Sequence, residues 1–315
     1  MKATALAPAN IAFIKYWGRK DTRLRLPYNA SISMNLSACT TTTTVEFSDA
    51  FTEDRVIFMG GGFSEQEVQR VIQQLDRIRG VAGVETRAKV VTQNSFPKSA
   101  GVASSASGFA ALTVAAAAAL DLKRSEKELT VLARLGSGSA CRSIPDGFVK
   151  WEDSFAYSLY PPGYWDLRDI LVIVEQTQKD VSSSAGHEGV TTSPNFAKRL
   201  EMLPQRIARL EDALKTKNFA LFGEVVEEEC LDMHHVMQTQ TPPLFYWNDV
   251  TKTIMEAVVG WRKDGLPVYF TIDAGPNVHL ICEGKDEERV VNAIKSVKSV
   301  KEIIVNKSAE GAHVI

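Results

Sequence analysis

Residues 94–122 read NSFPKSAGVASSASGFAALTVAAAAALDL and change in character along their length. They open with turn-forming residues, continue through small residues, and end in an Ala-rich run with high helix propensity. Small residues let a backbone approach a ligand closely, and the start of the following helix offers free N–H groups and the positive end of a dipole. The stretch therefore predicts a loop that binds the phosphates of a nucleotide.

The hydroxyl groups of Ser104, Ser105 and Ser107 add ligands for a phosphate or for Mg²⁺ at the start of that helix. The loop is not a Walker sequence, because GK[ST] is absent. From the residues alone a second interpretation stays open, in which a Ser-rich cap begins an ordinary core helix.

Upstream of the loop, the sequence favours strands and one helix. Residues 2–14 and 40–47 contain apolar and β-branched stretches, and residues 85–93 return to a strand pattern. Ser64 and Glu67 form a capping box before periodically spaced apolar residues, which predicts a helix.

Downstream of the loop, strands and helices alternate. Ser125 and Glu128 form a second capping box, and Ser193-Pro194 is a typical helix start. The apolar pattern predicts strands at 169–175, 266–273 and 278–283, and helices at 194–215, 218–237, 249–263 and 285–297. Interleaved elements predict an α/β or α+β class. The chain length allows one large domain or two closely packed lobes, and no flexible linker marks a boundary between lobes.

The composition is that of an ordinary globular enzyme. The chain has 315 residues and a net charge of −2, from 36 Lys and Arg against 38 Asp and Glu. This balance gives no footprint for nucleic acid and no polybasic signal for a membrane, so we expect neither partner. The four cysteines lack CxxC spacing, which indicates a reducing compartment. With no apolar run of about 20 residues and a poor signal sequence, we expect a cytoplasmic protein.

Several segments resemble one family of enzymes. Residues 97–107, PxxxGVASSAS, resemble the phosphate-binding motif of the GHMP kinase superfamily. Residues 7–21 (APANIAFIKYWGRKD) and 26–33 (LPYNASIS) resemble the N-terminus of mevalonate diphosphate decarboxylases. Residues 136–143 (GSGSACRS) and 270–278 (FTIDAGPNV) resemble two further signatures of that family, in the expected order.

The resemblance implies an α+β GHMP kinase fold. An ATP-binding lobe at 1–165 and a second lobe at 166–315 would pack closely, with a deep cleft between them. The implied reaction has two stages: ATP phosphorylates the C3 hydroxyl of a 5-phosphorylated mevalonate, and the C3 phosphate and CO2 then leave as a double bond forms. The resemblance thus implies ATP and Mg²⁺ as cofactors, a small-molecule substrate and a homodimer.

Three residues are candidates for that chemistry. Asp273 follows an apolar strand, where a carboxylate can orient or deprotonate a hydroxyl, although Asp-Ala-Gly-Pro also suits a turn that its own Asp caps. The resemblance makes Lys15 the catalytic-site lysine beside Asp273 and the transferred phosphoryl group. The planar fork of Arg142 suits bidentate carboxylate binding, and the resemblance assigns it to the C1 carboxylate of the substrate.

The resemblance also assigns residues to the two ligands. Those at substrate-binding positions are Asn10, Tyr16, Arg19, Ser137, Gly138, Ser139, Ala140, Ser183 and His187. Those at cofactor-binding positions are Asn94, Lys98, Gly101, Ala103, Ser104, Ser105 and Ser107, of which Ser104 and Ser105 are the candidates for Mg²⁺. Tyr16 and Arg19 are expected at the 5-phosphate end of the substrate.

One segment departs from the diphosphate enzymes. They usually carry an arginine that reaches the substrate diphosphate, and Ser184 stands there; His187 stands where they carry methionine. A lost guanidinium weakens an anion site by about 1.5–3 kcal/mol. The departure favours mevalonate 5-phosphate as substrate and isopentenyl phosphate as product, with His187 taking over part of the phosphate contact. The alternative is mevalonate 5-diphosphate, which gives isopentenyl diphosphate.

There are three further alternatives. A generic small-molecule kinase of the superfamily should lack the segments KYWG and GSGSACRS, and both are present here. A mevalonate 3-kinase would share the fold and the ATP loop but alter the positions of Asp273 and Lys15, and both residues are present here. A non-catalytic binding protein of the same fold would show a damaged loop or site, which this sequence does not.

Overall fold

The computed structural model describes residues 1–61, 63–97, 104–174 and 186–315. The fold is built on two sheets, in which most neighbouring strands are antiparallel. The larger sheet runs in the spatial order β13 (His313–Val314), β1 (Lys2–Ile14), β4 (Ser31–Phe47), β6 (Ala88–Asn94) and β5 (Arg55–Met59), and β7 (Phe148–Glu152) and β8 (Phe155–Tyr160) extend it beyond β4. The long β1–β4 pair is bulged between Pro8 and Asn10 and again between Ala12 and Ile14. These irregularities bend the end of β1 that leads into Lys15.

The smaller sheet has four antiparallel strands, in the order β10 (Tyr269–Thr271), β11 (Val278–Glu283), β9 (Leu167–Ile173) and β12 (Glu302–Lys307). Strand β9, one of its two inner strands, is buried along its whole length. A two-stranded ribbon, β2 (Arg19–Asp21) with β3 (Leu26–Pro27), follows the end of β1.

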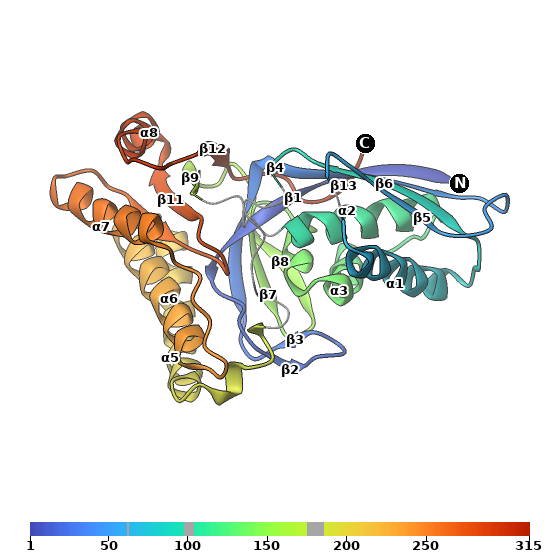
Figure 1. Cartoon of the computed structure of the whole chain (residues 1–315), viewed down its shortest axis with the longest axis horizontal. Helices are drawn as coiled ribbons and strands as arrows, with labels where there is room; N and C mark the ends of the chain where they lie inside the picture. The colour runs from blue at the N-terminus through green and yellow to red at the C-terminus, as the bar shows by residue number, and fades with distance from the viewer. Residues whose placement is uncertain (62, 98–103, 175–185) are drawn as a thin grey trace.

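The helices form two groups (Figure 1). Those packed on one face of the larger sheet are α1 (Glu65–Ala82), α2 (Ser104–Ala119) and α3 (Glu126–Gly136), and they share an apolar core with β1 and β4. Those beside the smaller sheet are α5 (Phe196–Thr216), α6 (Phe219–Thr239), α7 (Asp249–Lys263) and α8 (Glu287–Lys295). Short 3₁₀ helices are η1 (Gly138–Ser143), η2 (Val190–Thr192) and η3 (Gly284–Asp286).

A second core joins the two sheets. Ile11 and Phe13 of β1 pack in one cluster with Leu171 of β9 and Phe222 of α6. Strand β1 thus buries one face under α2 and the other under α6. This packing brings the start of α2 and the loop after β10 towards the C-terminal end of β1. Among the described residues, no helix is both long and apolar enough to cross a bilayer.

Both predicted capping boxes are confirmed, since each serine accepts a bond from the N3 backbone N–H and each glutamate side chain reaches back to the cap. The start of α5 was predicted wrongly: the helix begins at Phe196, after Asn195, and no side chain caps it. The strand expected at 266–273 covers only Tyr269–Thr271. Sequence reasoning missed β2, β3, β5, β7, β8, β12 and β13.

Candidate active site

Lys15 and Asp273 form an ion pair at the junction of the two sheets. Lys15 follows β1 and Asp273 follows β10, and Lys15 Nζ donates a hydrogen bond to Asp273 Oδ1 at 2.7 Å. The Lys15 side chain is 1% exposed and that of Asp273 is 24% exposed. The ammonium is therefore held inside the protein, while the carboxylate can still meet a ligand.

The groups around Asp273 keep its carboxyl group ionised. Burial acts to raise the pKa of Asp273, but the Lys15 ammonium, His279 and Arg142 together lower it below the ordinary value of 3.8. Two nearby groups of α6 carry no charge at neutral pH, because burial raises the pKa of the Cys230 thiol to about 11 and lowers that of His234 to about 3. An ionised carboxylate in this position can orient a hydroxyl group or accept its proton.

Arg142 is buried on η1 and bonds to neutral groups. Its Nη1 donates to Ser31 Oγ at 2.6 Å, its Nε to Ser33 Oγ at 3.1 Å, and its Nη2 to Asn10 Oδ1 at 3.2 Å. No ion pair joins Arg142 to an acidic side chain within the described ranges. A guanidinium fixed by three neutral partners keeps its charge for an anionic ligand, and the planar fork suits a carboxylate.

Asn10 acts through Arg142 and η1. Its Nδ2 donates to Ser143 Oγ at 2.8 Å and to Ser139 O at 3.2 Å, and its Oδ1 accepts from Arg142. These bonds orient the neighbours of Asn10, and its direct contact with the substrate stays a prediction. Ser31 and Ser33 were missed as site residues, although their spacing of two along a strand places both on one face.

Tyr16, Arg19 and Arg25 gather at the end of the site near β2 and β3. Arg19 Nε donates to Tyr16 Oη at 2.9 Å, and Arg25 Nε donates to Leu135 O at 3.0 Å. Burial, followed by the charges of Arg19 and two other arginines, lowers the pKa of Arg25 to about 10. Sequence reasoning assigned Tyr16 and Arg19 to this end but missed Arg25, whose charge only the fold brings to Arg19.

The Tyr16 ring requires a glycine at position 138. A Cβ on Gly138 would lie 2.6 Å from Tyr16 Cε1. We expect Gly138→Ala to cost about 1–3 kcal/mol of unfolding free energy, as overpacking does, when measured by urea denaturation. Gly163→Ala is the control, because its Cβ would meet no atom within 4 Å. Equal stability of the two variants would contradict the close packing of Tyr16 on Gly138.

His187 is a neutral, buried ring. Its centroid lies 4.4 Å from that of Tyr16 and 4.6 Å from that of Trp17, and Gly18 N–H donates to its Nδ1 at 2.8 Å. Burial and then the charges of Arg19 and Arg25 lower its pKa well below 6.5. His187 can therefore offer a phosphate group only one N–H donor, at Nε2. It does not replace the positive charge of the arginine that the family usually carries at position 184.

Hydroxyl groups connect the start of α2 with η1. Ser105 Oγ lies 3.1 Å from Ser137 Oγ, which in turn lies 3.5 Å from Ser139 Oγ. The candidate nucleotide-binding and substrate-binding serines thus adjoin one another. Ala140 of the same segment is fully buried in the apolar core, so only its main chain can face a ligand.

Ser107 was predicted as a ligand residue, and its hydroxyl group is engaged inside the protein, which leaves its main chain to meet a ligand. Its side chain is fully buried, with Thr41 Oγ1 at 2.6 Å, and it donates to Ser104 O at 3.3 Å. Small residues fit both the mouth and the inside of a helix start, so composition does not tell which face each serine takes. The predicted residues Lys98, Gly101, Ala103 and Ser183 lie outside the described residues, as does Ser184.

A pocket opens beside the start of α2. Ser104 and Ser105 line it together with Asn94 of β6, and further walls come from aromatic and basic side chains, including Phe58, Phe63, Phe109 and Arg70. Such a mixture of flat apolar rings, hydroxyl groups and one guanidinium suits a nucleotide. Within the described ranges no three His, Cys, Asp or Glu side chains cluster as metal ligands.

Comparisons with known proteins agree on one family. The model of the diphosphomevalonate decarboxylase-like N-terminal domain matches residues 7–158, and that of the mevalonate 5-diphosphate decarboxylase C-terminal domain matches residues 170–314. The diphosphomevalonate decarboxylase of Aspergillus fumigatus is 37% identical over 94% of this chain and 80% of its own length. The mevalonate diphosphate decarboxylase of Staphylococcus aureus superposes with a TM-score of 0.95, at 37% identity, over 100% of this chain and 98% of that one.

A further solved structure carries ligands. It is MDDEF in complex with MVAPP, AMPPCP and magnesium, with a TM-score of 0.93 and 36% identity over 100% of this chain and 99% of that one.

Proposed function

The chain belongs to the diphosphomevalonate decarboxylase family of the GHMP kinase superfamily, and from this we propose that it converts mevalonate 5-diphosphate to isopentenyl diphosphate. It is an ATP-dependent decarboxylase of a phosphorylated mevalonate, with ATP and Mg²⁺ as cofactors. The relatives support the diphosphate better than the monophosphate that the sequence favoured. The family also leaves no support for the 3-kinase or the inert binding protein.

The observation that carries the proposal is the convergence of Lys15, Asp273 and Arg142. The Lys15–Asp273 pair is formed at 2.7 Å, and the Arg142 charge contributes to the lowered pKa of Asp273. In the proposed reaction Asp273 orients the C3 hydroxyl of the substrate and accepts its proton. Lys15 holds Asp273 ionised and stabilises the negative charge of the transferred phosphoryl group. Arg142 fixes the C1 carboxylate, which is the group that leaves as CO2.

The pocket beside α2 fits the proposed nucleotide. The backbone N–H groups at the start of α2 favour phosphate oxygens, and Ser104, Ser105, Asn94 and Arg70 surround the same space. Bound MgATP supplies the phosphoryl group and neutralises its charge. Mg²⁺ usually keeps several waters and binds through few protein groups. The Ser104 or Ser105 hydroxyl group can therefore serve as its protein ligand, although the described residues include no cluster of three His, Cys, Asp or Glu side chains.

The charge at the phosphate end bears on the substrate. Arg25 adds a cation beside Arg19, which offsets the arginine missing at position 184 and supports a diphosphate. Mevalonate 5-phosphate stays the second candidate, because neutral His187 supplies no charge in compensation. The two arginines favour the diphosphate, since each charge-assisted bond to phosphate is worth about 1.5–3 kcal/mol.

The test incubates purified protein with MgATP and either mevalonate 5-diphosphate or mevalonate 5-phosphate. CO2 and the isoprenoid product are measured in each case, with unphosphorylated mevalonate as the control substrate. We expect kcat/KM for the diphosphate to exceed that for the monophosphate by at least about 10-fold, the effect of one charged hydrogen bond. A preference for the monophosphate would reverse the assignment, and ATP turnover without CO2 would reject a decarboxylase.

Two features of organisation stay proposals. We place the division between lobes near residue 165, supported by the end of β8 at Tyr160 and the start of β9 at Leu167, although β13 returns to the larger sheet. The homodimer and the cytoplasmic location remain predictions from the sequence.

A further inference from the structure

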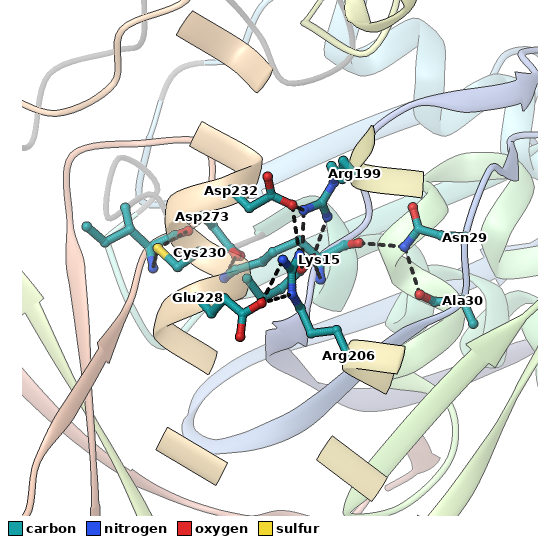
Figure 2. A network of polar contacts seen from close by, with 11 residues as sticks. Lys15, Asn29, Ala30, Arg199, Arg206, Glu228, Cys230, Asp232 and Asp273 are labelled. Atoms are coloured by element: carbon teal, nitrogen blue, oxygen red, sulfur yellow. Dashed lines mark hydrogen bonds and ion pairs between the residues drawn. The ribbon is translucent and has the colours of Figure 1, made fainter. Parts of the chain in front are cut away.

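The main chain of Lys15 is held on both sides by buried or half-buried side chains. Strand β1 ends at Ile14, so Lys15 lies just beyond the regular ladder. Its N–H donates to Glu229 Oε1 at 2.9 Å, and its C=O accepts from Asn29 Nδ2 at 2.9 Å. Figure 2 shows Lys15 between Asn29 on one side and the charged side chains of α5 and α6 on the other.

Glu229 is itself fixed by two arginines of α5. Its side chain is 0% exposed, and both of its oxygens accept bonds from Arg199, one of them at 3.1 Å. Arg206 Nη1 donates to Glu229 Oε2 at 2.7 Å, and Asp232 completes the network with bonds from both arginines. A carboxylate with this many buried donors has one orientation, so the acceptor that it presents to Lys15 is fixed as well.

The same turn of α6 holds the main chain next to Asp273. Cys230, the residue after Glu229, accepts a bond from Ile272 N–H at Sγ, at 3.2 Å, and His234 Nε2 lies 3.3 Å from Ile272 O. Ile272 immediately precedes Asp273 in the chain. One helix thus contacts the backbone beside both members of the Lys15–Asp273 pair.

We propose that Glu229 is a positioning residue, which fixes the Lys15 main chain so that the Lys15 ammonium stays on Asp273. Arg199 and Arg206 act with it by holding the Glu229 carboxylate in place. The proposal rests on the proposed function, because it concerns the catalytic pair of that reaction. Catalytic geometry is sensitive to such support, since a displacement of about 1 Å can cost about 100-fold in rate.

The test compares Glu229→Gln with Glu229→Met. Both remove the negative charge that faces Arg199 and Arg206, but only glutamine keeps an oxygen that can accept from Lys15 N–H. The matched control is Glu227→Met. Glu227 also lies on α6, pairs with an arginine (Arg262, at 2.9 Å) and accepts a backbone N–H, but that N–H belongs to Phe270.

The first readout is kcat against KM. We expect Glu229→Met to lower kcat at least about 10-fold with KM for both substrates within about 2-fold, because the support and not the binding groups is lost. For an equal loss of unfolding free energy, Glu229→Gln should retain a higher kcat than Glu229→Met. The alternative outcome is that kcat follows the free energy of unfolding in the same way for both Glu229 variants and for Glu227→Met. Glu229 would then have only a structural role.

The second readout is the acid limb of the kcat/KM pH profile, corrected for the ionisation of both substrates, to which the protonation of Asp273 contributes. The groups that face Asp273 are Lys15, Arg142, His279, Cys230 and His234. Lys15 lowers the pKa of Asp273, so a displaced ammonium raises it, and the acid limb moves to higher pH. We expect a shift of about 1 unit in Glu229→Met, within the range of a lost opposite charge, and none in Glu227→Met.

An unchanged acid limb in a folded Glu229→Met variant would overturn the proposal. Should that variant not fold, Asn29→Ala tests the same support from the other side, with a shift in the same direction expected and an unchanged limb again decisive against it. Activity of the wild-type protein separates the two claims. If it releases no CO2 from either phosphorylated mevalonate, the proposed function is rejected. If it turns over normally and the Glu229 variants match it in kcat and acid limb, only the role of Glu229 is rejected.

Discussion

Asp273→Asn is expected to lower kcat about 1,000-fold, while AMPPCP binds within about 2-fold of its wild-type affinity. Positioned acid–base groups contribute about 10²–10⁴-fold to rate, and asparagine cannot take up the proton of the C3 hydroxyl. The substitution preserves the shape of the side chain, and the Lys15 ammonium at 2.7 Å keeps an oxygen to bond. The loss should therefore fall on the chemical step, as measured by CO2 release at saturating substrate.

The control for this variant is Asp286→Asn. Asp286 is also a carboxylate in an ion pair, with Arg289 Nη1 at 2.6 Å, but it lies on η3. Its replacement should leave kcat within about 2-fold of wild type, the range of a substitution outside the site. If Asp273→Asn retained a kcat within a few-fold of wild type, the assignment of Asp273 would be wrong.

Arg142→Ala is expected to reduce CO2 release at least about 100-fold in kcat/KM. A bidentate pair between a guanidinium and a carboxylate comprises two charge-assisted bonds, and a charged hydrogen bond is worth about 1.5–3 kcal/mol, or about 10- to 150-fold. The variant also leaves Ser31, Ser33 and Asn10 without their shared donor. Parallel measurement of ADP and CO2 shows whether phosphoryl transfer or carboxylate loss is affected.

Substitution of Arg142 by lysine tests the planar shape of the guanidinium apart from its charge. Arg142→Lys keeps the charge but loses the planar fork, so an intermediate kcat/KM is expected. Arg79→Lys is the control, because Arg79 is also 3% exposed but is paired with Asp54. CO2 release from Arg142→Ala at the wild-type rate would remove Arg142 from the carboxylate site.

Local signals predicted much of the fold. The two capping boxes place α1 and α3, because a serine and a glutamate three residues apart satisfy the helix start by themselves. The strands β1 and β11 were likewise visible as apolar or β-branched runs. Strands β7 and β8 were not, since Phe148–Glu152 and Phe155–Tyr160 are short and mix aromatic with charged or polar residues.

The signature motifs indicated the catalytic candidates, but not what surrounds them. Lys15 and Asp273 are 258 positions apart, and only the fold brings them into contact. Glu229 supports Lys15 across 214 positions, in a helix whose sequence carries no sign of that role. The burial of the Ser107 hydroxyl group could not be predicted, because serine fits both a ligand mouth and a packed interior. The neutral state of His187 likewise depends on burial that no local pattern reports.

A crystal structure of the Asp273→Asn variant with mevalonate 5-diphosphate, AMPPCP and Mg²⁺ tests the shared site most directly. The expected result places the C3 hydroxyl within hydrogen-bond distance of residue 273, the C1 carboxylate on the Arg142 guanidinium, and the γ-phosphoryl group of AMPPCP beside Lys15 at the start of α2. A substrate whose carboxylate lies away from Arg142, or whose C3 hydroxyl lies beyond the reach of residue 273, would contradict the account.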